Sequence, residues 1–267
     1  LVIIHLGRAD FSFQKKNITK RIDLVVRSSA YGNSHPEINA ARRLRIPVLD
    51  YIDAVAELFN KKRGILVTGT HGKTSTTAMI GLMLEDAGYD PSVLVGATVR
   101  AWGKNARVGN GEWMVAEGDE YQNKFLKLRP EVAVVTSIEY DHPDFFKTRK
   151  QYEDVFRKFV SELPPGGLLI AERRLKRILT QAPCRVAWYG IAGKIEGKHV
   201  ELNKKAALCV ARFLGIPPQM ARRSLAHYTG AARRMEFYTA PVADTAVIDD
   251  YAHHPTEIRT TLAAVRR

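Results

Sequence analysis

The stretch that decides the fold is Ile65-Leu66-Val67-Thr68-Gly69-Thr70-His71-Gly72-Lys73-Thr74-Ser75-Thr76. Its apolar and β-branched start predicts a buried strand at 65–68, and residues 74–87 predict a helix that ends at Gly88. The glycines between strand and helix let the backbone curl so that several N–H groups face one anion. The positive end of the helix dipole favours the same anion. This strand–loop–helix pattern predicts a phosphate-binding loop.

Two side chains of this loop suit a nucleotide. Lys73 can reach the outer phosphates, and the Thr74 hydroxyl can ligate Mg²⁺. The spacing Gly-x-x-Gly-Lys-Thr is two residues shorter than the usual loop, but the strand before it and the helix after it supply the required context. The predicted nucleotide contacts are Gly69, Thr70, His71, Gly72, Lys73, Thr74 and Ser75.

Acidic residues follow the next predicted strand. The strand at 113–116 leads to three acids within 117–120. In an open α/β sheet, ligands bind at the carboxyl ends of the strands. Clustered acids repel one another unless a cation is present, so Glu117 is a candidate Mg²⁺ ligand together with Thr74. A solvated acidic loop is the alternative.

A second polar cluster follows the predicted strand at 132–136. It spans 139–144 and contains His142. Two polar clusters at strand ends, both downstream of one phosphate loop, favour a Mg²⁺–ATP site, although imidazole is a less usual Mg²⁺ ligand than an oxygen.

Strands and helices alternate along the rest of the chain. The 267 residues are 45% hydrophobic and 26% charged, which is typical of a globular protein of roughly two domains. Further strands are predicted at 1–7, 23–26, 46–49, 92–95, 167–170 and 246–248, and helices at 36–44, 51–59, 149–163 and 204–214. A linker is predicted at 61–64. This alternation predicts a parallel sheet covered by helices.

The charge balance indicates anionic partners. There are 41 Lys and Arg against 28 Asp and Glu, a net charge of +13. Phosphorylated small molecules, nucleic acid and membrane surfaces all suit this charge, and a solvated basic surface is the alternative. Nucleic acid is disfavoured because the basic residues are not interleaved with aromatic ones. No apolar run approaches a membrane span of roughly 18 residues, so no membrane insertion is expected. Two cysteines make no disulfide framework, which predicts a cytoplasmic protein.

Six motifs, in one order, resemble those of the Mur ligase family. They are the ATP loop at 69–76, Ala-Glu-Gly-Asp-Glu-Tyr at 116–121, Tyr-Asp-His-Pro-Asp at 140–144, the segment 197–207, Gly-Ala-Ala-Arg-Arg-Met-Glu at 230–236, and Asp-Asp-Tyr-Ala-His-His-Pro-Thr-Glu at 249–257. Upstream, Ser28-Ser29-Ala30 and residues 35–38 fit the UDP-binding domain of that family.

The resemblance implies three domains. These are a partial Rossmann-like, UDP-substrate-binding domain at 1–62, a P-loop-type ATP-binding domain with a parallel sheet at 63–229, and the start of a partial α/β ligase domain at 230–267. All three are expected to be shortened, the central one near 190–197. Val200 stands where the family has Asn. Either segments are missing from this sequence or the ligase is reduced.

Within the family, the motifs most resemble those of members that join L-alanine to UDP-N-acetylmuramate in peptidoglycan precursor synthesis. The resemblance implies that ATP phosphorylates the muramate carboxylate, that the amine of L-alanine attacks the acyl phosphate, and that phosphate leaves. The implied partners are UDP-N-acetylmuramate, L-alanine, ATP and Mg²⁺, with no nucleic acid, and the implied state is a monomer or weak homodimer.

The resemblance also implies roles for residues. The implied catalytic set is Lys73, Glu117, His142, Arg234 and Asp250. The implied Mg²⁺ ligands are Thr74, Glu117 and His142. His199 and Asn203 would contact the nucleotide, and Ser28, Ser29, His253 and His254 would contact the substrates.

Three alternatives stay open. One is the related ligase that attaches a ready-made tripeptide to UDP-muramate. Another is a non-catalytic nucleotide-binding remnant, suggested by the shortened domains and Val200. A nucleic-acid-binding ATPase is the weakest of the three.

Overall fold

The computed structural model describes residues 14–193, 198–239 and 246–266. The strand predicted at 1–7 therefore lies outside the described residues. The chain divides into two compact units, 1–61 and 62–267, and each is described by itself.

The first unit is a small α/β unit with a two-stranded parallel sheet. Its elements are the 3₁₀ helix η1 (Lys15–Asn17), β1 (Val25–Arg27), α1 (Pro36–Arg43), β2 (Val48–Asp50) and α2 (Tyr51–Phe59). The two strands pair in parallel, with Val25 opposite Val48. Both predicted helices are confirmed, and α1 starts where proline is tolerated, at its first turn. Ser28 and Ser29 follow β1, and Ser29 lies in a turn.

The second unit is built on a seven-stranded sheet in the order β5-β4-β6-β3-β7-β8-β9. The strands are β3 (Arg63–Thr68), β4 (Ser92–Val99), β5 (Lys104–Arg107), β6 (Trp113–Glu117), β7 (Val132–Val135), β8 (Leu168–Glu172) and β9 (Arg185–Tyr189). All neighbours pair in parallel except β4 and β5. The predicted α/β class is confirmed, whereas β5 and β9 were not predicted. The predicted linker at 61–64 was wrong at its end, because Arg63 and Gly64 already belong to β3.

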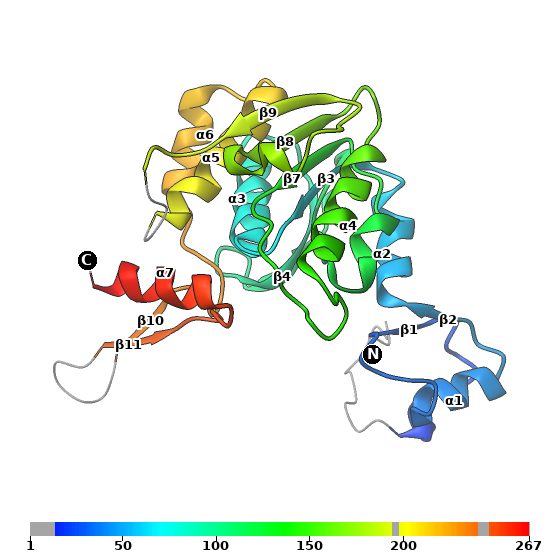
Figure 1. Cartoon of the computed structure of the whole chain (residues 1–267). Coiled ribbons are helices and arrows are strands. Elements are labelled where there is room, and N and C mark those ends of the chain that lie inside the picture. The colour runs from blue at the N-terminus through cyan, green and yellow to red at the C-terminus, as the bar shows by residue number, and fades with distance from the viewer. Residues whose placement is uncertain (1–13, 194–197, 240–245, 267) are drawn as a thin grey trace. The chain divides into compact units, whose positions relative to one another are not determined.

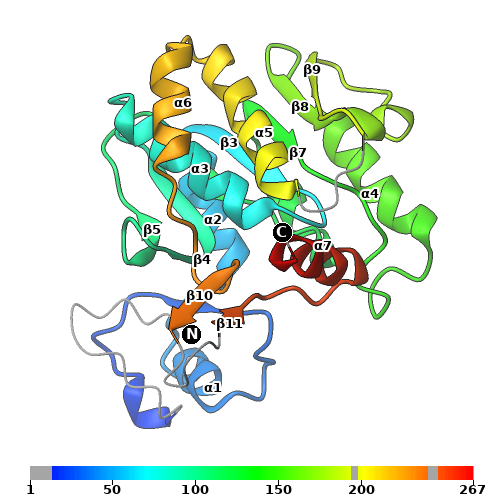
Figure 2. The ribbon, with the colours of Figure 1, turned by 90° about the vertical axis from the view of Figure 1, so that its left-hand side faces the viewer.

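Helices cover both faces of this sheet. They are α3 (Lys73–Asp86), α4 (Arg149–Ser161), α5 (His199–Phe213) and α6 (Pro218–Ala226), with the 3₁₀ helices η2 (Tyr121–Lys127) and η3 (Arg173–Arg177). In Figures 1 and 2, α3, α5 and α6 lie on one face and α4 on the other. The central strands are buried on both faces, which is why they are almost wholly apolar. No described helix has the length and apolar character needed to cross a bilayer.

The helix predicted at 204–214 begins five residues earlier, at His199. Glu201 lies in its first turn, where a carboxylate is favoured by the helix dipole. His199 and Asn203 therefore lie on the first turns of α5 itself. Helix α6, which the sequence did not predict, starts at Pro218, and its first turn tolerates a proline.

The chain ends in an antiparallel pair and a helix. These are β10 (Glu236–Thr239), β11 (Ala246–Asp249) and α7 (Pro255–Val265). The strand predicted at 246–248 is confirmed as part of β11.

The core of the second unit offers a direct stability test. Ile170 on β8 is fully buried in the apolar cluster between the sheet and the helices α3, α5 and α6. We expect Ile170→Ala to lower the free energy of unfolding by about 2–5 kcal/mol, through lost burial and a residual cavity. Val108→Ala is the matched control, because Val108 is 92% exposed and its truncation should change that free energy by less than about 0.5 kcal/mol.

Urea unfolding followed by tryptophan fluorescence measures the difference. All three tryptophans, at 102, 113 and 188, lie in the second unit. Equal midpoints for the two variants would contradict the assigned core.

Candidate active site

The phosphate loop lies between the ends of two neighbouring strands. Strand β3 pairs with β6 on one side and β7 on the other, so the loop at 69–72 emerges beside the ends of both. Gly69 has a φ of +126°, and a Cβ there would come within 2.5 Å of Thr136 Oγ1. Gly72 has a φ of +80°, and its added Cβ would come within 2.6 Å of Asn203 Oδ1. Only glycine fits both positions without strain.

Hydrogen bonds to Ser137 fix the loop at Thr70 and His71, whereas no side chain caps the start of α3. The backbone N–H of Thr70 donates to Ser137 O at 3.1 Å, and that of His71 donates to Ser137 Oγ at 2.8 Å. The N-cap of α3 is Gly72, which has no side chain to satisfy the N–H groups of the first helical turn. These groups and the helix dipole make this end of α3 suitable for an anion.

Lys73 is paired with a buried carboxylate. Its Nζ lies 3.0 Å from Glu120 Oε2 and 2.6 Å from Gly69 O, and the side chain of Glu120 is fully buried. Burial opposes both charges. The Lys73 ammonium nevertheless lowers the pKa of Glu120 to about 2, and Glu120 and Glu117 raise the pKa of Lys73 above its ordinary value. The pair is therefore ionised, with the ammonium held at the base of the phosphate loop.

Tyr152 on α4 joins this pair to the loop. Its hydroxyl donates to Glu120 Oε1 at 3.1 Å and lies 2.8 Å from Thr70 Oγ1. Burial raises the pKa of Tyr152, so the phenol stays protonated and can donate. The sequence carried no sign of this residue, because it lies within an ordinary amphipathic helix.

We expect Tyr152→Phe to lower the free energy of unfolding by about 1–3 kcal/mol, since the fully buried Glu120 loses a donor without gaining water. Tyr251→Phe is the control, because Tyr251 is 50% exposed. Urea unfolding compares the two variants. A Tyr152→Phe variant as stable as the control would mean that the phenol does not support Glu120.

Thr74 and Glu117 lie together, as the sequence predicted. Thr74 Oγ1 donates to Glu117 Oε1 at 3.1 Å, and the backbone N–H of Gly96 donates to Glu117 Oε2 at 2.8 Å. Arg234 Nη2 donates to Thr74 Oγ1 at 3.3 Å. Two oxygen donors beside the predicted phosphate loop form the type of set that Mg²⁺ takes together with phosphate and water.

His142 faces a different partner. Its Nε2 lies 3.7 Å from Glu120 Oε1 and 3.9 Å from Asp141 Oδ2, and its ring packs on Tyr121. Glu120 raises the pKa of His142 above its ordinary value, although burial opposes this shift. Its predicted role as a Mg²⁺ ligand stays a prediction.

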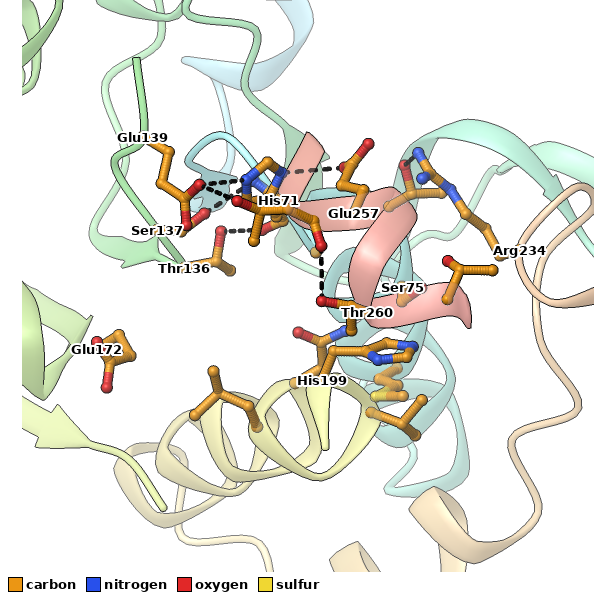
Figure 3. Close-up of a pocket in the computed structure, with 18 of the residues that line it drawn as sticks. His71, Ser75, Thr136, Ser137, Glu139, Glu172, His199, Arg234, Glu257 and Thr260 are labelled. Atoms are coloured by element: carbon orange, nitrogen blue, oxygen red, sulfur yellow. Dashed lines mark hydrogen bonds and ion pairs between the residues drawn. The ribbon is translucent and has the colours of Figure 1, made fainter. Parts of the chain in front are cut away.

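A cavity of about 800 Å³ opens beside the loop. It is bounded by the phosphate loop, the ends of β7 and β8, the start of α5, and α7; Figure 3 shows the side chains around it. His199 and Asn203 line it, and His199 Nδ1 is buried there with no hydrogen-bond partner among the described residues. Burial lowers the pKa of His199 and thus favours its neutral imidazole. The unpartnered Nδ1 can then form a hydrogen bond with a polar group of a ligand.

Asp250 organises the backbone at the cavity edge. Its carboxylate accepts from the N–H of Met235 and from that of Ala252, both at 2.8 Å. Its two oxygens are thus used within the chain, while Asp250 still lines the cavity. His253 is exposed, and His254 caps α7 by accepting the N–H of Thr256 at 3.2 Å. Ser28 and Ser29 belong to the other unit.

His71 is held between the carboxylates of Glu139 and Glu257, which lie in two of the quoted sequence patterns but had no predicted role. Its Nδ1 lies 3.1 Å from Glu257 Oε1 and its Nε2 lies 3.3 Å from Glu139 Oε2, as Figure 3 shows. Although burial opposes the charge, the two carboxylates raise the pKa of His71 to about 9. This geometry connects the phosphate loop to α7.

The mostly parallel sheet and the strand–loop–helix segment at 65–86 define a P-loop-type α/β fold. Residues 67–214 match the Mur ligase middle domain, and residues 4–63 match the Mur ligase family catalytic domain. The chain belongs to the Mur ligase family.

Known relatives agree with this membership. The chain is 38% identical over 288 residues to a UDP-N-acetylmuramate–L-alanine ligase of Desulfitobacterium hafniense, covering 96% of this chain and 64% of the relative. The chain thus spans less than two thirds of that relative's length.

Solved structures show the same fold. The Thermotoga maritima UDP-N-acetylmuramate–alanine ligase has a TM-score of 0.80 at 25% identity, covering 96% of this chain and 66% of that one. The UDP-N-acetylmuramate:L-alanyl-γ-D-glutamyl-meso-diaminopimelate ligase of Neisseria meningitidis has a TM-score of 0.72 at 23% identity, covering 83% of each chain.

Proposed function

We propose that this chain contributes the nucleotide-binding machinery of an ATP-dependent ligase that joins L-alanine to UDP-N-acetylmuramate in peptidoglycan precursor synthesis. The observation that carries the proposal is the placement of Lys73, Thr74 and Glu117 around one phosphate loop beside a cavity. The relative at 38% identity bears the name of this activity.

The residues fit Mg²⁺–ATP. Thr74 and Glu117 supply oxygen donors for the metal, which would neutralise phosphate charge when bound. The N–H groups at the start of α3, which have no side-chain cap, would bind phosphate oxygens, and Lys73 would stabilise charge on the transferred phosphoryl group. His199 and Asn203 would contact the rest of the nucleotide within the cavity.

The arrangement brings two cations, Lys73 and Arg234, to the loop where the phosphates of ATP would bind. The Lys73 ammonium is already paired with the Glu120 carboxylate, which Tyr152 holds in place by a hydrogen bond. An incoming phosphate would therefore compete with Glu120 for Lys73. Arg234 reaches Thr74 from the segment that follows α6, and this brings a second cation to the phosphate region. Acyl phosphate formation and attack by the L-alanine amine follow the course that the family resemblance implies.

L-Alanine is favoured over a tripeptide as the second substrate. The relative named for L-alanine shares 38% identity, whereas the structure named for a tripeptide shares 23% and supports the fold alone.

Phosphate release from ATP tests the proposal. We expect release only when UDP-N-acetylmuramate and L-alanine are both present. Release with L-alanyl-γ-D-glutamyl-meso-diaminopimelate but not with L-alanine would replace the proposed substrate. ATP binding without release under any combination would indicate a non-catalytic nucleotide-binding chain.

A further inference from the structure

A set of metal-ligand side chains lies outside the Thr74–Glu117 pair. It consists of His71 in the phosphate loop, Glu139 in the loop after β7, and His254 at the N-cap of α7. One donor atom from each lies within 4.8 Å of the other two. His71 Nε2 is 3.3 Å from Glu139 Oε2, and His254 Nδ1 is 3.8 Å from the same oxygen. Ligands at tetrahedral Zn²⁺ are about 3.3 Å apart, given bonds of about 2.0–2.1 Å. The two nitrogen–oxygen distances are within about 0.5 Å of that spacing.

One of these donor atoms has no hydrogen bond. His71 Nε2 is buried and lacks a hydrogen-bond partner among the described residues, with Glu139 facing it as an ion pair. His71 Nε2 faces a carboxylate and a second imidazole, and it can ligate a cation once its proton is released. The two histidine rings lie 4.6 Å apart, centroid to centroid.

Each of the three side chains also has an outer partner that would orient it. His71 Nδ1 lies 3.1 Å from Glu257 Oε1, the carboxylate–histidine arrangement that supports a metal-bound imidazole. Glu139 Oε2 accepts from Thr256 Oγ1 at 2.6 Å, and His254 Nε2 lies 3.4 Å from Tyr140 O. Nitrogen Nε2 of His254 can thus carry the proton and donate it to Tyr140 O, which leaves the lone pair of Nδ1 free to bind a metal ion.

We propose that His71, Glu139 and His254 form a binding site for a divalent transition-metal ion, with Zn²⁺ as the representative ion. Two imidazole nitrogens and one carboxylate oxygen suit Zn²⁺, whereas Mg²⁺ prefers oxygen ligands. The fourth position is left for water. Binding breaks the N–H bond at His71 Nε2 and releases that proton to solvent, while His254 Nδ1 exchanges its cap bond from Thr256 for the metal.

The site would tie three segments together. His71 belongs to the loop that ends β3, Glu139 follows β7, and His254 begins α7, so one ion would clamp α7 onto the phosphate loop. This role goes beyond the proposed ligase function and does not depend on it.

Zinc titration of the whole chain by calorimetry tests the site. We expect one Zn²⁺ per chain, with affinity unchanged by millimolar Mg²⁺, and Co²⁺ in its place should show the visible absorption of a four-coordinate ion. Glu139→Gln keeps an acceptor for Thr256, and His254→Asn keeps a helix N-cap. Both should weaken Zn²⁺ binding at least roughly tenfold, by analogy with losses seen when metal-site contacts are removed.

His253→Ala is the matched control, because it alters the neighbouring exposed histidine of the same segment. It should leave Zn²⁺ affinity unchanged. Absence of stoichiometric binding, displacement by Mg²⁺, or equal affinity in the wild type, Glu139→Gln and His254→Asn would overturn the site. The cluster would then be an ion-pair network around a protonated His71. Because metal binding is measured without turnover, its failure would not bear on the ligase proposal.

Discussion

Lys73→Met is expected to abolish phosphate release and to weaken ATP binding strongly. The Lys73 ammonium lies at the base of the phosphate loop and is held there by Glu120 and by Gly69 O. A preorganised cation at a transferring phosphoryl group is worth several kcal/mol in the transition state. We therefore expect turnover to fall by a factor on the order of 10³ or more. Calorimetric ATP titration and a phosphate-release assay measure the two effects.

The same substitution should also destabilise the fold, which would confuse the result without a control. Removing Lys73 leaves the fully buried Glu120 carboxylate without its cation. This should lower the free energy of unfolding by about 3–5 kcal/mol. The double variant Lys73→Met/Glu120→Gln removes both charges and should regain much of the stability while staying inactive. Turnover recovered in the double variant, or retained in the single one, would contradict a direct role for Lys73.

Glu117→Gln is expected to remove the Mg²⁺ dependence of ATP binding while the fold is kept. The amide oxygen can still accept from Thr74 or Gly96, but it lacks the charge that holds a divalent cation. Since a bound metal supplies several kcal/mol of charge stabilisation, turnover should fall roughly 100-fold or more. Titration with ATP at several Mg²⁺ concentrations separates the loss of metal from the loss of nucleotide.

Glu112→Gln provides the control for this change. Glu112 is an exposed carboxylate that pairs with Arg63 at the start of β3. Its neutralisation should leave Mg²⁺-dependent ATP binding unchanged. If Glu117→Gln behaved like Glu112→Gln, the Thr74–Glu117 pair would not be the metal site.

Several parts of the site follow from sequence patterns. The approach of Thr74 to Glu117 was predicted because both follow parallel strands, whose carboxyl ends meet at one edge of the sheet. The strand predictions were sound where apolar runs are continuous, as in β7 and β8. They failed at β5, which is polar, lies at the sheet edge and is only partly buried. The helix prediction at 204–214 also placed the start of α5 five residues too late.

Other contacts of the site were not predicted from the sequence. Tyr152 lies 32 residues from Glu120, and His71 lies 186 residues from Glu257. An isolated tyrosine or glutamate in an amphipathic helix has the same local environment whether or not it faces a buried charge. The role of each side chain can be assigned only when the tertiary structure shows which residue it contacts.

The amino-acid order by itself determined the phosphate loop, the alternation of strands and helices, and the family, because backbone conformation and strand burial depend on neighbours in the chain. Only the tertiary structure decided that Glu120 neutralises Lys73, that Tyr152 supports this pair, and that His71, Glu139 and His254 converge. Charges and hydrogen bonds act across space over a few ångströms, and the fold alone brings these distant residues within that range.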